Sequence, residues 1–136
     1  MEVPMKRLLL ALAAAVQVVA PAARAGDVVT LAPAAQDLER GEALVVDIRE
    51  PSEWRETGVL PNAVLVPFRD ADSFLAQVGP RLKPGQPIAL ICRSGRRSAA
   101  AAAAIAGRSE HPVVNVAGGM VRLMHEGYRP APCPVC

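Results

Sequence analysis

The segment IALICRSGRRSAAAAAA, residues 88–104, joins an apolar run to an alanine-rich run through one cysteine. Its first four residues have the length and composition of a buried strand, and the alanines favour a helix. Cys92 is therefore expected at a strand-to-helix turn, and three arginines follow it within five residues. Backbone N–H groups at such a turn can converge on one anion, and the helix dipole adds to their field. The pattern predicts a lowered pKa for the Cys92 thiol and a reactive thiolate.

The rest of the chain predicts an α/β fold in one domain. Apolar runs alternate with helical stretches, which is typical of βαβ units on a parallel sheet. The expected strands span residues 28–31, 44–48, 63–66, 88–91 and 113–116, and the expected helices span residues 34–40, 52–56, 73–78, 97–107 and 120–126. Ser52 and Asp72 are the expected N-caps of the second and third helices. Aromatic residues make up only 3% of the 136 residues, so the core is expected to consist of Val, Leu, Ile and Ala.

The first 25 residues have the layout of a cleavable export signal. Lys6 and Arg7 precede an apolar stretch over residues 8–20, and Ala23 and Ala25 supply the small residues that an export peptidase reads. The stretch is shorter than the roughly 20 apolar residues of a membrane anchor. We therefore expect a signal at residues 1–25, a domain at 26–130 and a tail at 131–136. The mature protein is expected in the periplasm or secreted, and not bound to a membrane.

The charge of the chain argues against a nucleic-acid partner. Removal of residues 1–25 lowers Lys plus Arg from 15 to 12 and Asp plus Glu from 13 to 12, which leaves a neutral domain. Binding to nucleic acid or to an anionic membrane surface generally requires a net positive face. The arginines near Cys92 are then a local feature of a neutral protein.

Several motifs together resemble the rhodanese domains, which are sulfurtransferases. The loop from Cys92 to Arg97 resembles their persulfide-forming loop. Further likenesses are VVDIR at 45–49 with SEW at 52–54, GVLPNA at 58–63, and the glycines at 118, 119 and 127. The family more commonly has His at position 59, Gly at 62 and Trp at 123, where this chain has Val59, Asn62 and Leu123. The resemblance covers residues 28–130 and implies a central parallel five-stranded sheet with helices on both faces.

The same resemblance implies an exported sulfurtransferase that works through a persulfide. Cys92 would attack a donor such as thiosulfate, and a thiol, cyanide or a redox protein would accept the sulfur in a second step. The expected substrate-binding residues are those of the loop, namely Arg93, Ser94, Gly95, Arg96 and Arg97. Arg96 and Arg97 are the candidates for guiding an anionic donor, because a guanidinium can bind two oxygens at once. Neither a cofactor nor a metal is expected.

Two other functions compete with this one. A non-catalytic sulfur carrier or docking module could keep the fold, but a docking module has no need of Cys92. A thiol phosphatase or arsenate reductase would also place a cysteine in an anion-binding loop. The phosphatase signature requires an arginine six positions after the cysteine, where this chain has Ser98, and its loop is one residue longer.

The acidic and basic residues outside the loop are expected to support the fold. Asp47 is expected to hydrogen-bond the loop, and Arg49 is expected to pair with Glu53. His111 and His125 have no catalytic partners in the sequence pattern and are expected to be ordinary residues.

The chain ends in a Cys-X-X-Cys motif whose role the sequence leaves open. Cys133 and Cys136 can pair and leave Cys92 free. The pair could be a small disulfide, a redox or sulfur-accepting pair that serves Cys92, or half of a metal site. In the second case a tail thiolate would attack the Cys92 persulfide and then close a disulfide.

Overall fold

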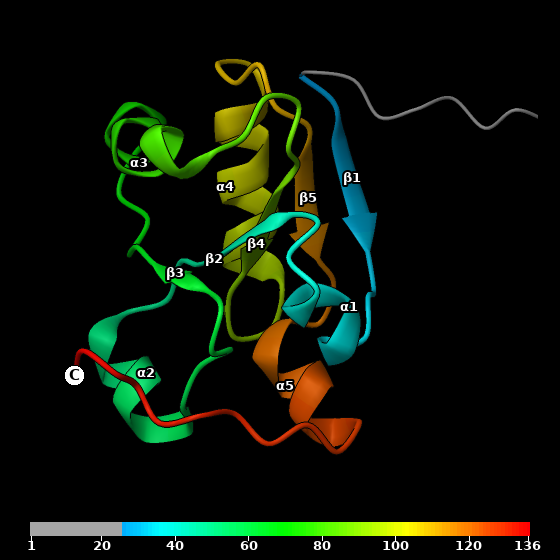
Figure 1. Ribbon diagram of the computed structural model, residues 1–136, viewed down its shortest axis with the longest axis vertical. Helices are drawn as coiled ribbons and strands as arrows, with labels where there is room; N and C mark the ends of the chain where they lie inside the picture. Colours follow the sequence, from blue (N-terminus) through cyan, green and yellow to red (C-terminus); the bar gives the residue numbers. More distant parts are fainter. Residues whose placement is uncertain (1–25) are drawn as a thin grey trace, which may run out of the picture.

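A parallel five-stranded sheet forms the centre of the computed structural model, which describes residues 26–136 (Figure 1). The strand order is β1-β5-β4-β2-β3, and every pairing within the sheet is parallel. The strands are β1 (Val28–Leu31), β2 (Leu44–Asp47), β3 (Val64–Leu65), β4 (Ile88–Ile91) and β5 (Val113–Val116). The predicted α/β class and the parallel five-stranded sheet are confirmed.

Helices cover both faces of this sheet. They are α1 (Ala35–Glu39), α2 (Pro51–Thr57), α3 (Ala71–Val78), α4 (Arg96–Ala106) and α5 (Gly119–His125), with a short 3₁₀ turn at Gly79–Arg81. Alternate residues of the central strands serve two cores: Leu90 packs with α3 and α4, whereas Ile91 packs with α1 and α5. The cores consist almost entirely of aliphatic side chains, as the composition predicts.

Two of the predicted helix caps are wrong. Helix α3 is capped by Asp70, whose carboxylate accepts a hydrogen bond from the Ser73 amide at 2.8 Å. Asp72 instead pairs with Arg108, which follows α4. Helix α2 begins at Pro51 with Glu50 as its N-cap, so it starts before Ser52. In both helices the observed start is held by a local hydrogen bond, from the Ser73 amide to Asp70 and from the Glu50 amide to Glu53.

The strand register brings the ends of the three central strands together. Asp47 of β2 is level with Ile91 of β4, and Leu90 is level with Asn115 of β5. Residues that follow these strands therefore meet at the carboxyl edge of the sheet, where a parallel sheet generally binds its ligands. The loop after β4 lies at this edge, between α2 and α5 (Figure 1).

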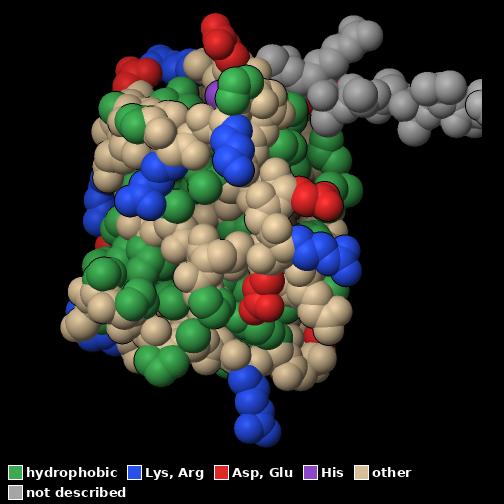
Figure 2. All heavy atoms as spheres, in the orientation of Figure 1, with side chains coloured by type: hydrophobic (Ala, Val, Ile, Leu, Met, Phe, Trp, Pro, Cys, Tyr) green, Lys and Arg blue, Asp and Glu red, His purple; other side chains and the backbone are tan. Residues whose placement is uncertain are grey.

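Charges of both signs are interspersed on the face of the molecule that Figure 2 shows. The export signal predicted over residues 1–25 lies outside the residues that the structure describes. Between residues 26 and 136, none of the helices combines the length and the hydropathy of a membrane-spanning segment.

Candidate active site

The loop after β4 is shaped by close backbone contacts with α5. The amides of Met120 and Val121 donate to the carbonyls of Cys92 and Arg93, at 2.9 and 3.0 Å. Because the C=O and N–H of a trans peptide point in opposite directions, these bonds turn the next amides away from α5 and toward the inside of the loop. The contact requires Gly119, since a Cβ there would lie 2.5 Å from the Arg93 carbonyl oxygen.

Gly95 closes the loop and starts α4. Its φ of 94° lies in the left-handed region that favours glycine, and a Cβ there would lie 2.9 Å from the Gly118 amide nitrogen. The predicted glycine turn is therefore confirmed, and α4 begins directly after it at Arg96.

The Cys92 sulfur lies inside this loop, surrounded by hydrogen-bond donors. Sγ accepts from the Gly95 amide at 3.1 Å and from the Ser98 amide at 3.4 Å, and the Ser98 hydroxyl lies 3.3 Å away. Burial alone would raise the pKa of the Cys92 thiol. The Ser98 hydroxyl and the amides of Ser98, Gly95 and Ser94 outweigh it, so the pKa is lowered from its ordinary value. The residue is 1% exposed, so the loop controls access to the sulfur.

Sequence reasoning missed the role of Ser98. Its hydroxyl also donates to Asn115 Oδ1 at 2.6 Å, and the Asn115 amide reaches Thr30 Oγ1 at 3.5 Å. Ser98 and Asn115 are both buried, so a series of hydrogen-bonded side chains runs from Sγ through the core to β1. The asparagine within the otherwise apolar strand VVNV was the signal, because a buried polar side chain requires a partner.

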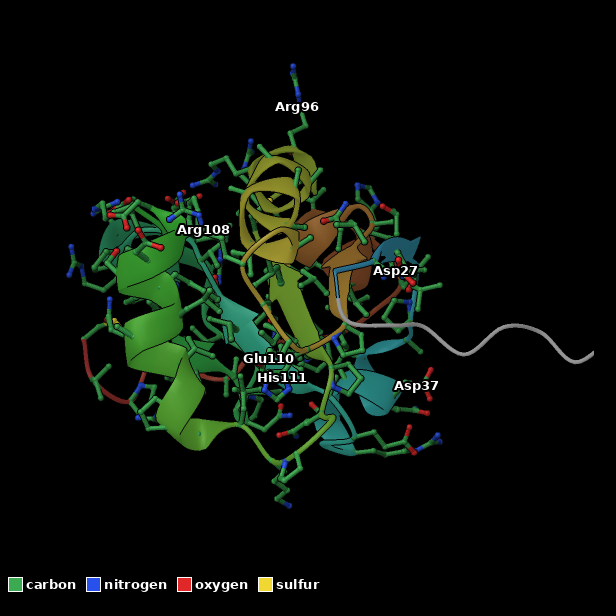
Figure 3. All side chains as sticks on the ribbon, turned by 90° about the horizontal axis from the view of Figure 1, so that it is seen from above. Asp27, Asp37, Arg96, Arg108, Glu110 and His111 are labelled. Atoms are coloured by element: carbon green, nitrogen blue, oxygen red, sulfur yellow. A yellow bond between two sulfur atoms is a disulfide. The ribbon has the colours of Figure 1, made fainter. Side chains whose placement is uncertain are left out.

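The loop arginines differ in their surroundings. Arg97 donates two hydrogen bonds to the Glu53 carboxylate, at 2.8 and 2.6 Å, and the bond from Arg97 is the main cause that lowers the Glu53 pKa to about 2. Arg96 points away from the body of the molecule (Figure 3). Arg93 lines a cavity beside the loop, and Ser94 is exposed.

The ion pairs near the loop differ from the predicted ones. Arg49 does not pair with Glu53: its Nη2 lies 2.7 Å from Asp47 Oδ2, and both side chains are buried. Its other donors reach Thr57 Oγ1 and the Gly58 carbonyl, at 2.7 and 2.8 Å. Asp47 therefore bonds Arg49 and not the loop, and this pair anchors the end of α2 to β2.

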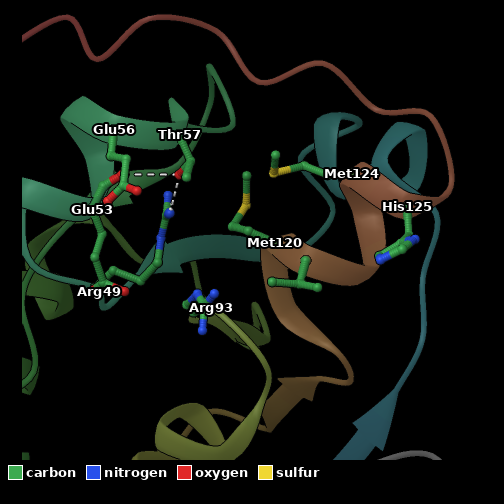
Figure 4. A pocket seen from close by; sticks show the side chains of 9 residues that line it. Arg49, Glu53, Glu56, Thr57, Arg93, Met120, Met124 and His125 are labelled. Atoms are coloured by element: carbon green, nitrogen blue, oxygen red, sulfur yellow. Dashed lines mark hydrogen bonds between the residues drawn. The ribbon is translucent and has the colours of Figure 1, made fainter.

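A cavity of about 390 Å³ lies between α2 and α5 (Figure 4). One wall carries Glu53, Glu56 and Thr57 of α2, and Arg93 of the loop lies below them. Met120 and Met124 line it from α5, and His125, expected to be an ordinary residue, also reaches it.

Cys133 and Cys136 form a disulfide, which is one of the alternatives that the sequence left open, and Cys92 is free. The tail is held in place by two backbone hydrogen bonds between Val59 and Ala131, at 2.8 and 2.9 Å. The disulfide lies beside Arg55 and Thr57 of α2. Among residues 26–136, His, Cys, Asp and Glu nowhere form a cluster that could hold a metal ion.

Comparison with known proteins places this site in a family. Residues 30–126 match the family model of the rhodanese-like domain. A rhodanese-related protein from Thermoplasma volcanium is 30% identical, over 71% of this chain and 93% of that chain, with a TM-score of 0.51. A rhodanese-like domain protein from Staphylococcus aureus is 23% identical, over 77% and 98% of the chains, with a TM-score of 0.54.

A polysulfide-sulfur transferase homodimer from Wolinella succinogenes is 24% identical, over 82% of this chain and 83% of that chain, with a TM-score of 0.62. None of the curated proteins matches. Since the family model spans more than half of the sequence, the chain belongs to the rhodanese-like domain family.

Proposed function

We propose that this protein is a sulfurtransferase that carries sulfane sulfur as a persulfide on Cys92, with thiosulfate as the donor. The surroundings of the Cys92 sulfur carry the proposal: two backbone amides and one hydroxyl lie within 3.4 Å of Sγ. Such donors stabilise a sulfur anion and lower the thiol pKa. Membership of the rhodanese-like family supports sulfur transfer as the type of reaction.

The reaction proceeds in two displacements. The Cys92 thiolate attacks the outer sulfur of thiosulfate, an Sγ–S bond forms, and sulfite leaves with the electron pair of the broken S–S bond. The loop amides then stabilise the charge on the persulfide. An acceptor such as cyanide attacks the outer sulfur, and the electron pair of the Sγ–S bond returns to Cys92.

The arginines have separate roles in this proposal. Arg96 and Arg93 have no ion-pair partner among residues 26–136, so both are available to attract an anionic donor. Arg97 keeps its bidentate pair with Glu53 and ties the start of α4 to α2.

Thiocyanate formation from thiosulfate and cyanide tests the proposal. The wild-type chain should turn over, and Cys92→Ser should be inactive. A Cys133→Ser, Cys136→Ser double variant is the matched control and should retain its rate within about twofold, because cyanide requires no second thiol. Absence of thiocyanate with the wild type would favour the non-catalytic docking function instead.

We further propose that residues 1–25 direct the protein to the periplasm or out of the cell. The pattern of Lys6, Arg7 and the apolar stretch over 8–20 supports this. Protein sequencing after expression in a bacterial host should find a mature chain that begins at Gly26. A chain that begins at Met1 and stays in the cytoplasm would contradict export.

A further inference from the structure

The cavity between α2 and α5 is larger and less polar than a small oxyanion requires. Its volume of about 390 Å³ is in the range of pockets that bind organic ligands, and thioether and alkyl groups of Met120, Val121 and Met124 line it. Val121 and Met124 are 37% and 41% exposed, so the apolar lining is accessible from outside. These features indicate a ligand with a carbon skeleton.

The cavity borders the loop that carries the reactive sulfur, because Arg93, the residue after Cys92, lines it. The Met120 and Val121 amides bind the Cys92 and Arg93 carbonyls, so the residues that line the cavity also hold the loop. A ligand that lies on α5 beside Arg93 is adjacent to the residue that bears the sulfur. The second substrate of a sulfur transfer has to reach this position.

Two charged groups of the cavity are available to a ligand. Arg49 is bound by Asp47, and Glu53 is bound by Arg97, so both of these charges are neutralised. Arg93 of the loop and Glu56 of α2 are exposed, and neither side chain has a hydrogen-bond or ion-pair partner within the described part of the chain. The cavity therefore offers one free cation and one free anion along with its methionine lining.

We propose that this cavity binds the sulfur acceptor, and that the acceptor is a small zwitterionic thiol. Its carboxylate meets Arg93, its ammonium group meets Glu56, and its carbon chain packs on Met120 and Met124. The inference rests on the proposed function of Cys92. The acceptor thiol attacks the outer sulfur of the Cys92 persulfide anion, its proton passes to that outer sulfur, the Sγ–S bond breaks, and the electron pair of the bond returns to Sγ. The products are the acceptor persulfide, which keeps the proton, and the Cys92 thiolate.

The kinetic test compares two acceptors on one enzyme form. L-Cysteine carries the ammonium group, and 3-mercaptopropionate lacks it. The ratio of their kcat/KM values cancels differences in folding and in persulfide formation between variants. Glu56→Gln should lower this ratio about twofold to fivefold, the range of an exposed ion pair. Glu42→Gln is the matched control, because Glu42 is exposed and precedes β2, at the opposite edge of the sheet. An equal ratio in all three forms would overturn the proposal.

A binding measurement separates this inference from the proposed function. S-Methyl-L-cysteine is the unreactive probe, and ¹³C-labelled methionine methyl groups of the full chain report on its binding. The Met120 and Met124 signals should shift with saturation, and Glu56→Gln should raise Kd by the same twofold to fivefold factor. Absence of shifts at both methionines overturns the acceptor site even if Cys92 forms a persulfide. Shifts without any persulfide on Cys92 would refute the proposed function and leave the cavity as a zwitterion site.

Discussion

Replacing Ser98 by Ala should make the Cys92 thiolate harder to form, whereas replacing Asn115 by Leu should make it easier. The Ser98 hydroxyl lies 3.3 Å from Sγ and 2.6 Å from Asn115 Oδ1, but it has one proton and can donate to only one of them at a time. In the thiol form the hydroxyl donates to Asn115. When the thiolate forms, the proton turns to Sγ and the bond to Asn115 is lost.

The size of the effect follows from this exchange. A hydrogen bond to a charged group contributes about 1.5–3 kcal/mol, and a neutral one contributes about 0.5–1.5 kcal/mol. The difference, about 1–1.5 kcal/mol, is the net contribution of Ser98, so Ser98→Ala should lower the thiolate fraction about fivefold to tenfold at a pH below the thiol pKa. Asn115→Leu removes the competing acceptor at similar side-chain volume, so the thiolate fraction should rise by about twofold to tenfold.

The rate of iodoacetamide alkylation as a function of pH measures the thiolate directly. Cys92 is the free thiol as long as the disulfide of the tail stays intact. Ser98→Thr keeps the hydroxyl and is the matched control, and thermal unfolding of each variant verifies the fold. If the alkylation profiles of Ser98→Ala and Asn115→Leu shift in the same direction along the pH axis, the idea is refuted that Sγ and Asn115 compete for the one hydroxyl proton of Ser98.

Three other predictions concern the frame of the loop. Because the Glu53 pKa is lowered to about 2, mainly by its hydrogen bond with Arg97, its stabilisation is fully present above about pH 5 and is lost as the pH falls through about 2. Glu53→Gln should flatten the acid side of a urea-unfolding profile against pH, and a profile identical to the wild type would contradict this. Gly119→Ala should lower sulfur transfer at least about tenfold, because its Cβ displaces the Arg93 carbonyl. Gly107→Ala is the control, because a Cβ at Gly107 would meet no atom within 4 Å. Equal rates of sulfur transfer for the two variants would contradict the prediction. Asp47→Ala should lower the free energy of unfolding by about 3–5 kcal/mol, because Arg49 is left buried and unpaired. Asp72→Ala, which breaks the exposed pair with Arg108, should cost less than about 1 kcal/mol, and equal costs in chemical denaturation would count against the argument.

The fold and the reactive loop could be predicted because their signals are local. Strand β4 and helix α4 differ sharply in composition, and Gly95 lies between them. The Cys-X-X-Cys spacing allowed Cys133 and Cys136 to pair, and the structure selects this disulfide among the alternatives that the sequence left open. Each of these inferences required only residues that are close in sequence.

The ion pairs and the series of hydrogen-bonded side chains behind Cys92 could not be predicted in the same way. Glu53 was expected to pair with Arg49, which is close in sequence, but its partner is Arg97, 44 positions away. Only the packing of α2 against the start of α4 decides this. Ser98 served as an argument against a phosphatase, but its contact with Sγ depends on the first turn of α4 folding over the cysteine.

The mass of the intact protein after thiosulfate treatment shows whether Cys92 forms a persulfide. We expect the addition of one sulfur, about 32 Da, that maps to the peptide with Cys92 and disappears after cyanide. The Cys133→Ser, Cys136→Ser variant should gain the same mass, and Cys92→Ser should gain none. An adduct that persists in Cys92→Ser, or no adduct on the wild type, would contradict a Cys92 persulfide.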